Sequence, residues 1–150
     1  MDNCNNTHVL IIDDDLKISF LLKQLLVRNN FIVLNALNIK EAKLLLYCFH
    51  CDIIILDYML PDINGVEFLK SLRNKNITIP IIMLTAINET DIKLESLQLG
   101  ADDYLAKPFH SEELVLRIKN LLKRTKKETS SQFINFSGMR FNPATGELYK

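Results

Sequence analysis

Five short apolar runs alternate along the chain with longer amphipathic stretches, and this alternation limits the fold more than any other feature. The runs are Val9 to Ile12, Phe31 to Leu34, Ile53 to Leu56, Ile81 to Leu84 and a weaker one around Tyr104 and Leu105. Continuous apolar runs of this length are typical of strands that are buried on both faces of a parallel sheet. The pattern therefore predicts five strands, most of them buried.

The stretches between the runs carry apolar residues at the spacing of one helix face. The stripes are Ile18, Leu21, Leu22, Leu25 and Leu26; Ala42, Leu45, Leu46 and Phe49; Gly65, Phe68, Leu69 and Leu72; and Leu114, Ile118, Leu121 and Leu122. Residues 89–99 have a less regular stripe, which predicts a fourth helix with looser packing. Strands that alternate with helices predict right-handed crossovers and a doubly wound α/β domain over residues 7–124.

Composition and charge exclude several classes of protein. An apolar fraction of 48% is enough to build a core, which excludes a disordered chain. Eighteen basic residues balance eighteen acidic ones, so no overall field favours nucleic acid or an anionic membrane. The longest apolar run, Leu44 to Phe49, is far shorter than the roughly 20 residues of a membrane-spanning helix. Without a basic and apolar leader, and with only three cysteines, the chain is expected in the cytoplasm, with neither disulfides nor a membrane partner.

The last part of the chain differs from the rest. Residues 1–122 carry a net charge of −4 and residues 123–150 one of +4. Residues 125–131 are polar and small, which predicts a linker. Residues 132–150 alternate like short strands on either side of a turn. A segment this short cannot bury a core of its own, so it is expected to be the beginning of a second domain.

Polar side chains follow four of the five apolar runs. Asp13 and Asp14 follow the first, Asp57 ends the third, Thr85 ends the fourth and Lys107 follows the fifth. In doubly wound folds, ligands bind beyond the carboxyl ends of the strands. We therefore expect these five side chains to meet at one edge of the sheet.

The chemistry of this set indicates phosphoryl transfer. Three carboxylates that meet at a sheet edge repel one another unless a cation lies among them, and hard oxygen ligands of this kind suit Mg²⁺. Lys107 and Thr85 add an ammonium and a hydroxyl, which can bind a phosphoryl group. A carboxylate can also accept a phosphoryl group as a mixed anhydride. Asp57, at the end of the most apolar strand, is the expected acceptor.

Four separated motifs carry a resemblance to a known family. They are Val9-Leu10-Ile11-Ile12-Asp13-Asp14-Asp15, the spacing from Asp57 to Pro61 with Gly65 after it, Thr85-Ala86, and the string from Gly100 through Ala101-Asp102-Asp103-Tyr104 to Lys107-Pro108-Phe109. Together they resemble the receiver domain of two-component response regulators. The Ala101-Asp102-Asp103-Tyr104 version and the start of a winged-helix-like tail resemble the OmpR/PhoB subfamily of transcriptional regulators.

The resemblance implies a fold and a domain organisation. The fold would be the flavodoxin-like or CheY-like one, a five-stranded parallel sheet in the order 2-1-3-4-5, here with a short β tail. Residues 1–124 would form the receiver domain, residues 125–131 a linker and residues 132–150 the N-terminal fragment of a winged-helix DNA-binding domain. DNA binding would require a complete C-terminal module.

The resemblance also implies roles for the site residues. Asp57 would accept a phosphoryl group from a sensor histidine kinase, in a switch that is not an enzyme with a separate substrate. Asp13 and Asp14 would hold Mg²⁺ together with Asp57 and the main-chain carbonyl of Met59, and Lys107 would contact the phosphoryl group. The family also has a cis peptide bond at the position of Lys107-Pro108.

The same resemblance implies a switch and a dimer surface. Thr85 would contact the phosphoryl group, and Tyr104 would follow it inward, which would repack the face formed by the fourth helix, fifth strand and fifth helix. That face would form a phosphorylation-dependent homodimer, with ion pairs at positions that are here Lys93 with Glu113 and Asp103 with Arg117. Glu95 stands where relatives often have a basic residue.

Two apolar residues depart from the family pattern. Met59 and Ile87 stand two positions after the acceptor and two after the threonine, where relatives use polar side chains to orient the hydrolytic water. Because neither side chain can hydrogen-bond that water, slow intrinsic dephosphorylation is expected.

Other interpretations of these residues are weaker. Asp13-Asp14-Asp15 could simply cap a helix, which we expect only of Asp15. Cys48-Phe49-His50-Cys51 has the spacing of a metal or redox motif, but His8 and His110 are far away in the sequence, so core packing is expected. The basic residues 123–127 are expected to be solvated.

Two other functions also remain. A receiver could act through protein contacts alone. An aspartate-nucleophile phosphatase typically has a second acid where this chain has Met59, which disfavours an enzyme.

Overall fold

The computed structural model describes residues 7–85, 100–131, 134–136, 139–142 and 147–149. Its larger unit is a five-stranded parallel sheet in the order β2-β1-β3-β4-β5. The elements of this unit are β1 (His8–Ile12), α1 (Leu16–Arg28), β2 (Ile32–Ala36), α2 (Ile39–Cys48), β3 (Ile53–Asp57), α3 (Gly65–Asn74), β4 (Ile81–Thr85), β5 (Asp103–Ala106) and α5 (Ser111–Ser131). The predicted doubly wound α/β fold with the order 2-1-3-4-5 is confirmed.

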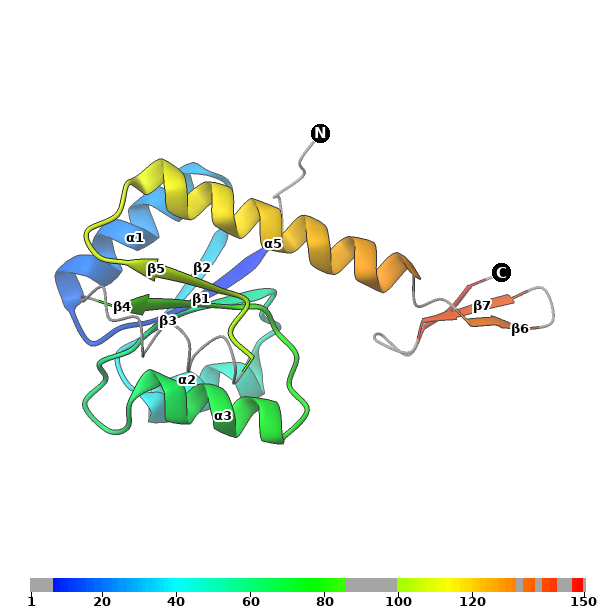
Figure 1. Ribbon diagram of the computed structural model, residues 1–150, viewed down its shortest axis with the longest axis horizontal. Coiled ribbons are helices and arrows are strands. Elements are labelled where there is room, and N and C mark those ends of the chain that lie inside the picture. Colours follow the sequence, from blue (N-terminus) through cyan, green and yellow to red (C-terminus); the bar gives the residue numbers. More distant parts are fainter. Residues whose placement is uncertain (1–6, 86–99, 132–133, 137–138, 143–146, 150) are drawn as a thin grey trace.

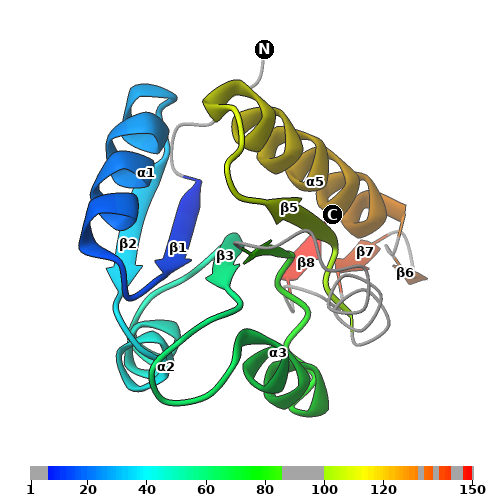
Figure 2. The ribbon, with the colours of Figure 1, turned by 60° about the vertical axis from the view of Figure 1, so that its left-hand side comes forward.

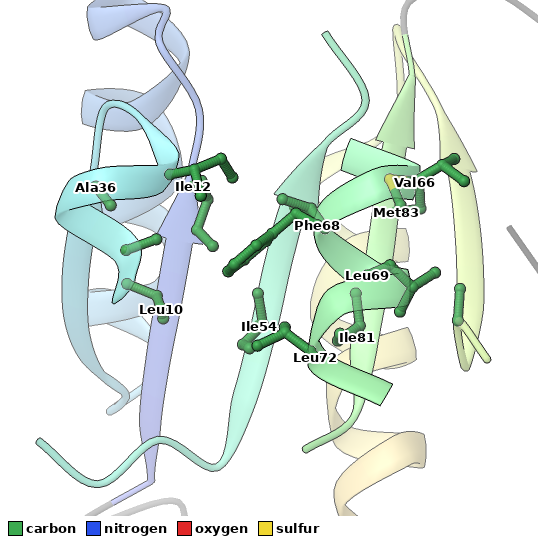
Figure 3. Packing of buried hydrophobic residues seen from close by; sticks show 14 of the residues in the cluster. Leu10, Ile12, Ala36, Ile54, Val66, Phe68, Leu69, Leu72, Ile81 and Met83 are labelled. Atoms are coloured by element: carbon green, nitrogen blue, oxygen red, sulfur yellow. The ribbon is translucent and has the colours of Figure 1, made fainter. Parts of the chain in front are cut away.

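Helices cover both faces of the sheet, with α1 and α5 on one face and α2 and α3 on the other (Figures 1 and 2). Each face has its own core of buried side chains. On the α2 and α3 face, Phe68, Leu69 and Leu72 of α3 pack over Ile54 and Ile81 of the sheet (Figure 3). β3 and β4 are buried along their whole length, as their continuous apolar runs predict.

Three helices begin at a polar cap. The side chain of Asp15 accepts hydrogen bonds from the backbone N–H groups of Lys17 and Ile18, which confirms Asp15 as the cap of α1. Asn38 and Asn64 cap α2 and α3 in the same way. These caps fix where each helix starts after its strand, so they also fix the loops at the carboxyl edge of the sheet.

The structure differs from the expected elements at two places. β2 lies at the edge of the sheet, and all of its residues except Ala36 are at least partly exposed, because only one neighbouring strand covers it. α5 continues through Ser131, so residues 125–131, which are predicted to be a linker, are helical. No Gly or Pro interrupts the chain between Pro108 and Gly138, and Lys and Glu favour a helix there. The predicted fourth helix, residues 89–99, lies outside the described residues.

The tail forms a separate small sheet. β6 (Ile134–Phe136), β7 (Met139–Asn142) and β8 (Glu147–Tyr149) pair in antiparallel order β6-β7-β8. The three short strands agree with the alternation in the sequence. Among the helices that the structure describes, none has the length and apolar composition required to cross a membrane.

Gly65 brings the start of α3 against the end of β3. Its backbone N–H donates a 2.7 Å hydrogen bond to the carbonyl of Tyr58. A Cβ at this position would lie 2.6 Å from the carbonyl oxygen of Asp57 and 3.1 Å from the Sδ of Met83. Only glycine permits this close approach, which sets the backbone position of Asp57.

Replacing Gly65 with alanine should therefore destabilise the protein by about 1 to 3 kcal/mol, because the new methyl group meets backbone. The better helix propensity of alanine, about 1 kcal/mol, does not compensate for this clash. Urea unfolding measures the change. Lys70→Ala, on the exposed side of the same helix, is the control and should unfold like the wild type. A Gly65→Ala variant as stable as the wild type would contradict the close approach.

Candidate functional site

The carboxyl ends of four strands bring the predicted polar residues to one edge of the sheet. Asp13 directly follows β1, Asp57 and Thr85 are the last residues of β3 and β4, and Lys107 directly follows β5. Asp13, Asp57 and Thr85 are all buried. The backbone N–H of Lys107 donates to the carbonyl of Thr85 at 2.6 Å, which joins the last two strand ends.

Three carboxylates form the centre of the site. Asp13, Asp14 and Asp57 each place an oxygen within 4.8 Å of the others. Asp13 is 1% exposed and Asp57 7%, whereas Asp14 is exposed. The acidic cluster, as we call these three residues, thus has two buried members and one at the surface.

Local hydrogen bonds hold Asp13 in place. Its Oδ1 accepts the backbone N–H of Asp15 at 2.9 Å, and its own N–H donates to the carbonyl of Ala36. The hydroxyl of Ser19, on α1, donates to the carbonyl of Asp13 at 3.2 Å. Ser19 was not among the residues predicted from the sequence. Its signal was a polar residue at a core position of an amphipathic helix, where it is 2% exposed.

Lys107 is the cation that faces the acidic cluster. Its Nζ lies 3.2 Å from Oδ2 of Asp13 and 3.5 Å from Oδ1 of Asp57. One ammonium group therefore contacts two carboxylates. The site keeps an excess of negative charge, since Asp14 adds a third carboxylate.

Burial, together with the negative charge of Asp13, raises the pKa of Asp57 from 3.8 to about 6. Lys107 and a hydrogen bond from the backbone N–H of Met59 act in the opposite direction. The ionised form of Asp57 is therefore disfavoured inside the protein but is still the main form at neutral pH. A cation that binds the acidic cluster would favour the ionised form.

The donor set of the acidic cluster fits Mg²⁺. All of its ligands are carboxylate oxygens, the exposed Asp14 leaves one side open to water, and the excess negative charge attracts a divalent cation. The backbone N–H of Met59 donates a hydrogen bond to Asp57, and the Met59 side chain is 67% exposed. The role of its carbonyl as a metal ligand stays a prediction.

Residues of the expected switch and dimer surface lie around β5. The ring of Tyr104 is buried in the core of the α2 and α3 face. Arg117 pairs within the chain with Asp103, at 2.7 Å and 2.8 Å, and with Glu113 at 3.0 Å. These pairs raise the pKa of Arg117. The other residues named for this surface, Lys93 and Glu95, lie outside the described residues, as does Ile87. The peptide bond between Lys107 and Pro108 is cis, as expected.

The motif around Cys48 is only partly buried. Cys51 is buried, but Cys48 and His50 are exposed, so core packing applies to one of its two cysteines. Cys48 lies at the last position of α2 and Cys51 in the loop before β3.

Comparison with known proteins identifies the family. The model of the response regulator receiver domain matches residues 9–119. The chain belongs to this family. All four strand ends that carry the site residues lie inside the matched range.

Curated relatives are similar to this protein over most of its length. Protein PetR of Rhodobacter capsulatus is 38% identical over 150 residues, which are 99% of this chain and 63% of PetR. The phosphate regulon transcriptional regulatory protein PhoB of Pseudomonas aeruginosa is 39% identical over 137 residues, 90% of this chain and 60% of PhoB. The transcriptional regulatory protein ResD of Bacillus subtilis is 41% identical over 124 residues, 83% of this chain and 51% of ResD. The receiver chain thus spans about half to three fifths of these relatives.

Solved receiver domains share the fold. The receiver domain of the Francisella response regulator 1452 has a TM-score of 0.76 and 42% identity, over 80% of this chain and 99% of that one. A CheY-like receiver domain protein from Methanospirillum hungatei has a TM-score of 0.77 and 30% identity, over 81% and 98%. The predicted response regulator receiver with OmpR/PhoB-type relatives is confirmed.

Without a cation, the charge on Asp57 should destabilise this receiver. Its pKa is higher in the folded than in the unfolded chain, so the folded state binds more protons between about pH 4 and pH 6. The resulting loss of stability is absent below the pKa of Asp57 in the unfolded chain. It is complete above the pKa of Asp57 in the folded protein. Asp57→Asn should therefore stabilise the chelator-treated protein at neutral pH by about 1 to 3 kcal/mol.

Urea unfolding in the presence of a chelator measures this change. Asp15→Asn is the matched control, because it removes a neighbouring charge but keeps a good helix cap, and it should leave stability unchanged. If Asp57→Asn proved less stable than the wild type under these conditions, the proposed repulsion in the acidic cluster would be refuted.

Proposed function

We propose that this receiver is a phosphorylation switch of a two-component system, in which Asp57 accepts a phosphoryl group from a sensor histidine kinase. The observation that carries the proposal is the position of Asp57. Its carboxylate is buried at a strand end, beside Asp13 and Asp14, with the Lys107 ammonium 3.5 Å away. A structural carboxylate at such a place would be costly, whereas a phosphoryl acceptor requires it.

The transfer step assigns a role to each residue. A carboxylate oxygen of Asp57 attacks phosphorus, the bond to the donor nitrogen breaks, and an acyl phosphate forms. The ionised form of Asp57 is the nucleophile, and a pKa of about 6 leaves it ionised at neutral pH. Lys107 is close enough to exchange its contact with Asp57 for one with the new phosphoryl oxygens.

Mg²⁺ belongs to the same proposal. Asp13, Asp14 and Asp57, with the main-chain carbonyl of Met59, are the residues that would hold it. The ion would supply positive charge opposite the phosphoryl oxygens during transfer. Asp13 is preorganised for this role, because its hydrogen bonds to Asp15 and Ala36 fix it before any ligand binds.

The output of the switch passes through β4 and β5. Thr85 pairs with Ala106 and Met83 with Tyr104 in the sheet, so a change at the end of β4 is adjacent to β5. We assign Thr85 and Tyr104 as the switch. The paired strands support this assignment, because Thr85 and Tyr104 lie on neighbouring strands and both are buried, so a movement of Thr85 toward the phosphoryl group would be felt at β5.

A homodimer through the face of the predicted fourth helix, β5 and α5 is the active form that we propose. Asp103, Glu113 and Arg117 are already paired with one another within the chain. Dimerisation would therefore exchange these pairs for pairs between two copies, Lys93 with Glu113 and Asp103 with Arg117. Transcriptional control, DNA binding and a cytoplasmic location are properties that we propose for the whole regulator. PhoB and ResD, both named as transcriptional regulatory proteins, support the first of these.

The residue at position 59, Met59, disfavours the alternative function of a phosphatase. An aspartate-nucleophile phosphatase needs a proton donor and acceptor two residues after the nucleophile, and a thioether cannot perform this role. The Met59 side chain is also 67% exposed and therefore not held against Asp57. We therefore propose a phosphoacceptor switch and not an enzyme with its own substrate.

Incubation with acetyl phosphate and Mg²⁺ tests the acceptor. Intact mass spectrometry should show the addition of one phosphoryl group to the wild type and none to Asp57→Asn. Asp15→Asn, which keeps the acidic cluster, should be modified like the wild type. Equal modification of the Asp57→Asn variant would place the acceptor elsewhere and end the proposal.

The lifetime of the acyl phosphate tests the role of Met59. We expect the phosphorylated wild type to lose its label over many minutes to hours, because Met59 offers no hydrogen bond to an attacking water. Met59→Asn should shorten this lifetime, whereas Met59→Leu should not. Loss of label from the wild type within seconds would contradict the interpretation.

A further inference from the structure

An apolar groove lies between α2 and α3, which cover the same face of the sheet (Figures 1 and 2). Buried Phe68 and Leu72 of α3 line it, together with partly buried Leu46 of α2 and Ile77. Its volume is about 300 Å³. This is the lower end of the range of about 300 to 1,000 Å³ for small-molecule pockets. The α2–α3 groove, as we call it, therefore suits a few inserted side chains better than a large cofactor.

Large apolar side chains of α2 are exposed beside this groove. Tyr47, which lines the groove, is 91% exposed, and Leu44 is 63% exposed. Because the two residues are three positions apart in one helix, they lie on the same side of it. Phe49, which directly follows α2, is also exposed. Single exposed apolar residues are ordinary on a protein surface, whereas a cluster of them beside a groove is typical of an interaction surface.

Two lysines give the α2–α3 groove a positive charge. Lys43 of α2 and Lys75, the C-cap of α3, both line it, and none of the described residues that line it is acidic. Neither lysine has an ion-pair partner in the part of the chain that the structure describes. Glu41 and Asp62 instead accept backbone N–H groups at or just before the start of α2. The charge that complements this groove must come from another molecule.

We propose that the α2–α3 groove binds an acidic amphipathic helix of a partner protein. Such a helix inserts apolar side chains, three or four positions apart, into a hydrophobic groove. Carboxylates on both sides of this apolar stripe would pair with Lys43 and Lys75. Tyr47 is the anchor of the surface, because tyrosine offers a large contact area and is enriched among the residues that dominate binding.

Charge disfavours a second copy of this chain as the occupant. A symmetric dimer uses the same surface of both copies. It would bring two Lys43 side chains and two Lys75 side chains into one interface, where like charges weaken association. A lipid surface would reach the exposed Tyr47, but side chains fill a concave groove better. An acidic helix satisfies both the charge and the shape of the groove.

This docking surface goes beyond the phosphorylation switch. Its residues belong to α2, to α3 and to the segment after α3, and none is a member of the acidic cluster. α5, part of the surface proposed for the homodimer, covers the opposite face of the sheet (Figure 1). A partner helix can therefore bind while Asp57 carries a phosphoryl group and while α5 contacts a second copy.

A synthetic helix tests the proposal. The probe is a fluorescein-labelled peptide with leucine at every third or fourth position and glutamate on its other faces, and its match has lysine in place of glutamate. Fluorescence anisotropy during titration with the full chain measures binding. The glutamate peptide should bind the wild type at least about tenfold more tightly than the lysine peptide, and added salt should weaken its binding.

Three variants assign this binding to the α2–α3 groove. Tyr47→Ala should weaken binding of the glutamate peptide by about tenfold or more, and its exposed position leaves the core intact. The double variant Lys43→Glu, Lys75→Glu should lose the glutamate peptide and gain affinity for the lysine peptide. Lys70→Glu is the matched control, because it reverses an exposed charge of α3 outside the groove and should bind like the wild type.

Other results would overturn the proposal. These are an absence of binding by the wild type, equal affinity for the two peptides, and an equal effect of Lys70→Glu and the double variant. Two more belong to the other occupants: self-association in analytical ultracentrifugation that Tyr47→Ala abolishes, and Tyr47-dependent binding to phosphatidylglycerol vesicles without peptide binding. Acetyl phosphate should modify Tyr47→Ala like the wild type, so failure here is distinct from failure of the switch.

Discussion

Asp13 and Asp57 hold two like charges in the interior, and the Lys107 ammonium lies against both. This unbalanced charge governs the remaining features of the receiver. Burial and this charge together raise the pKa of Asp57, and the charge attracts a divalent cation. The Lys107 ammonium gives a phosphoryl group on Asp57 a countercharge as soon as it forms. Neutral residues at these positions would make the protein more stable, but the site would then not respond to phosphorylation.

The parallel sheet assembles this charge from distant parts of the chain. Each crossover returns the chain to the same edge, so the ends of β1, β3, β4 and β5 meet although they are far apart in sequence. Close packing then fixes the details, as at Gly65, where α3 approaches the backbone of Asp57. The same crossovers bring the other ends of β1 and β3 together, which is how His8 comes to lie beside Asp52.

Features that depend on local pattern could be predicted from the sequence. Apolar runs located the strands, and the polar residues directly after them formed the acidic cluster with Lys107. Features that depend on neighbours in space could not. The exposure of β2 depends on its place at the sheet edge, and the contact of His8 with His50 depends on the crossover between them. Tertiary contacts of this kind leave no mark in the spacing of residues.

The affinity of the acidic cluster for Mg²⁺ tests the central claim most directly. Isothermal titration of Mg²⁺ into the wild type, Asp13→Asn and Asp15→Asn compares a buried member of the cluster with a capping aspartate next to it. The account predicts one ion bound by the wild type and by Asp15→Asn, and binding at least about tenfold weaker in Asp13→Asn. Equal affinity in all three proteins would show that the buried carboxylates do not hold the cation.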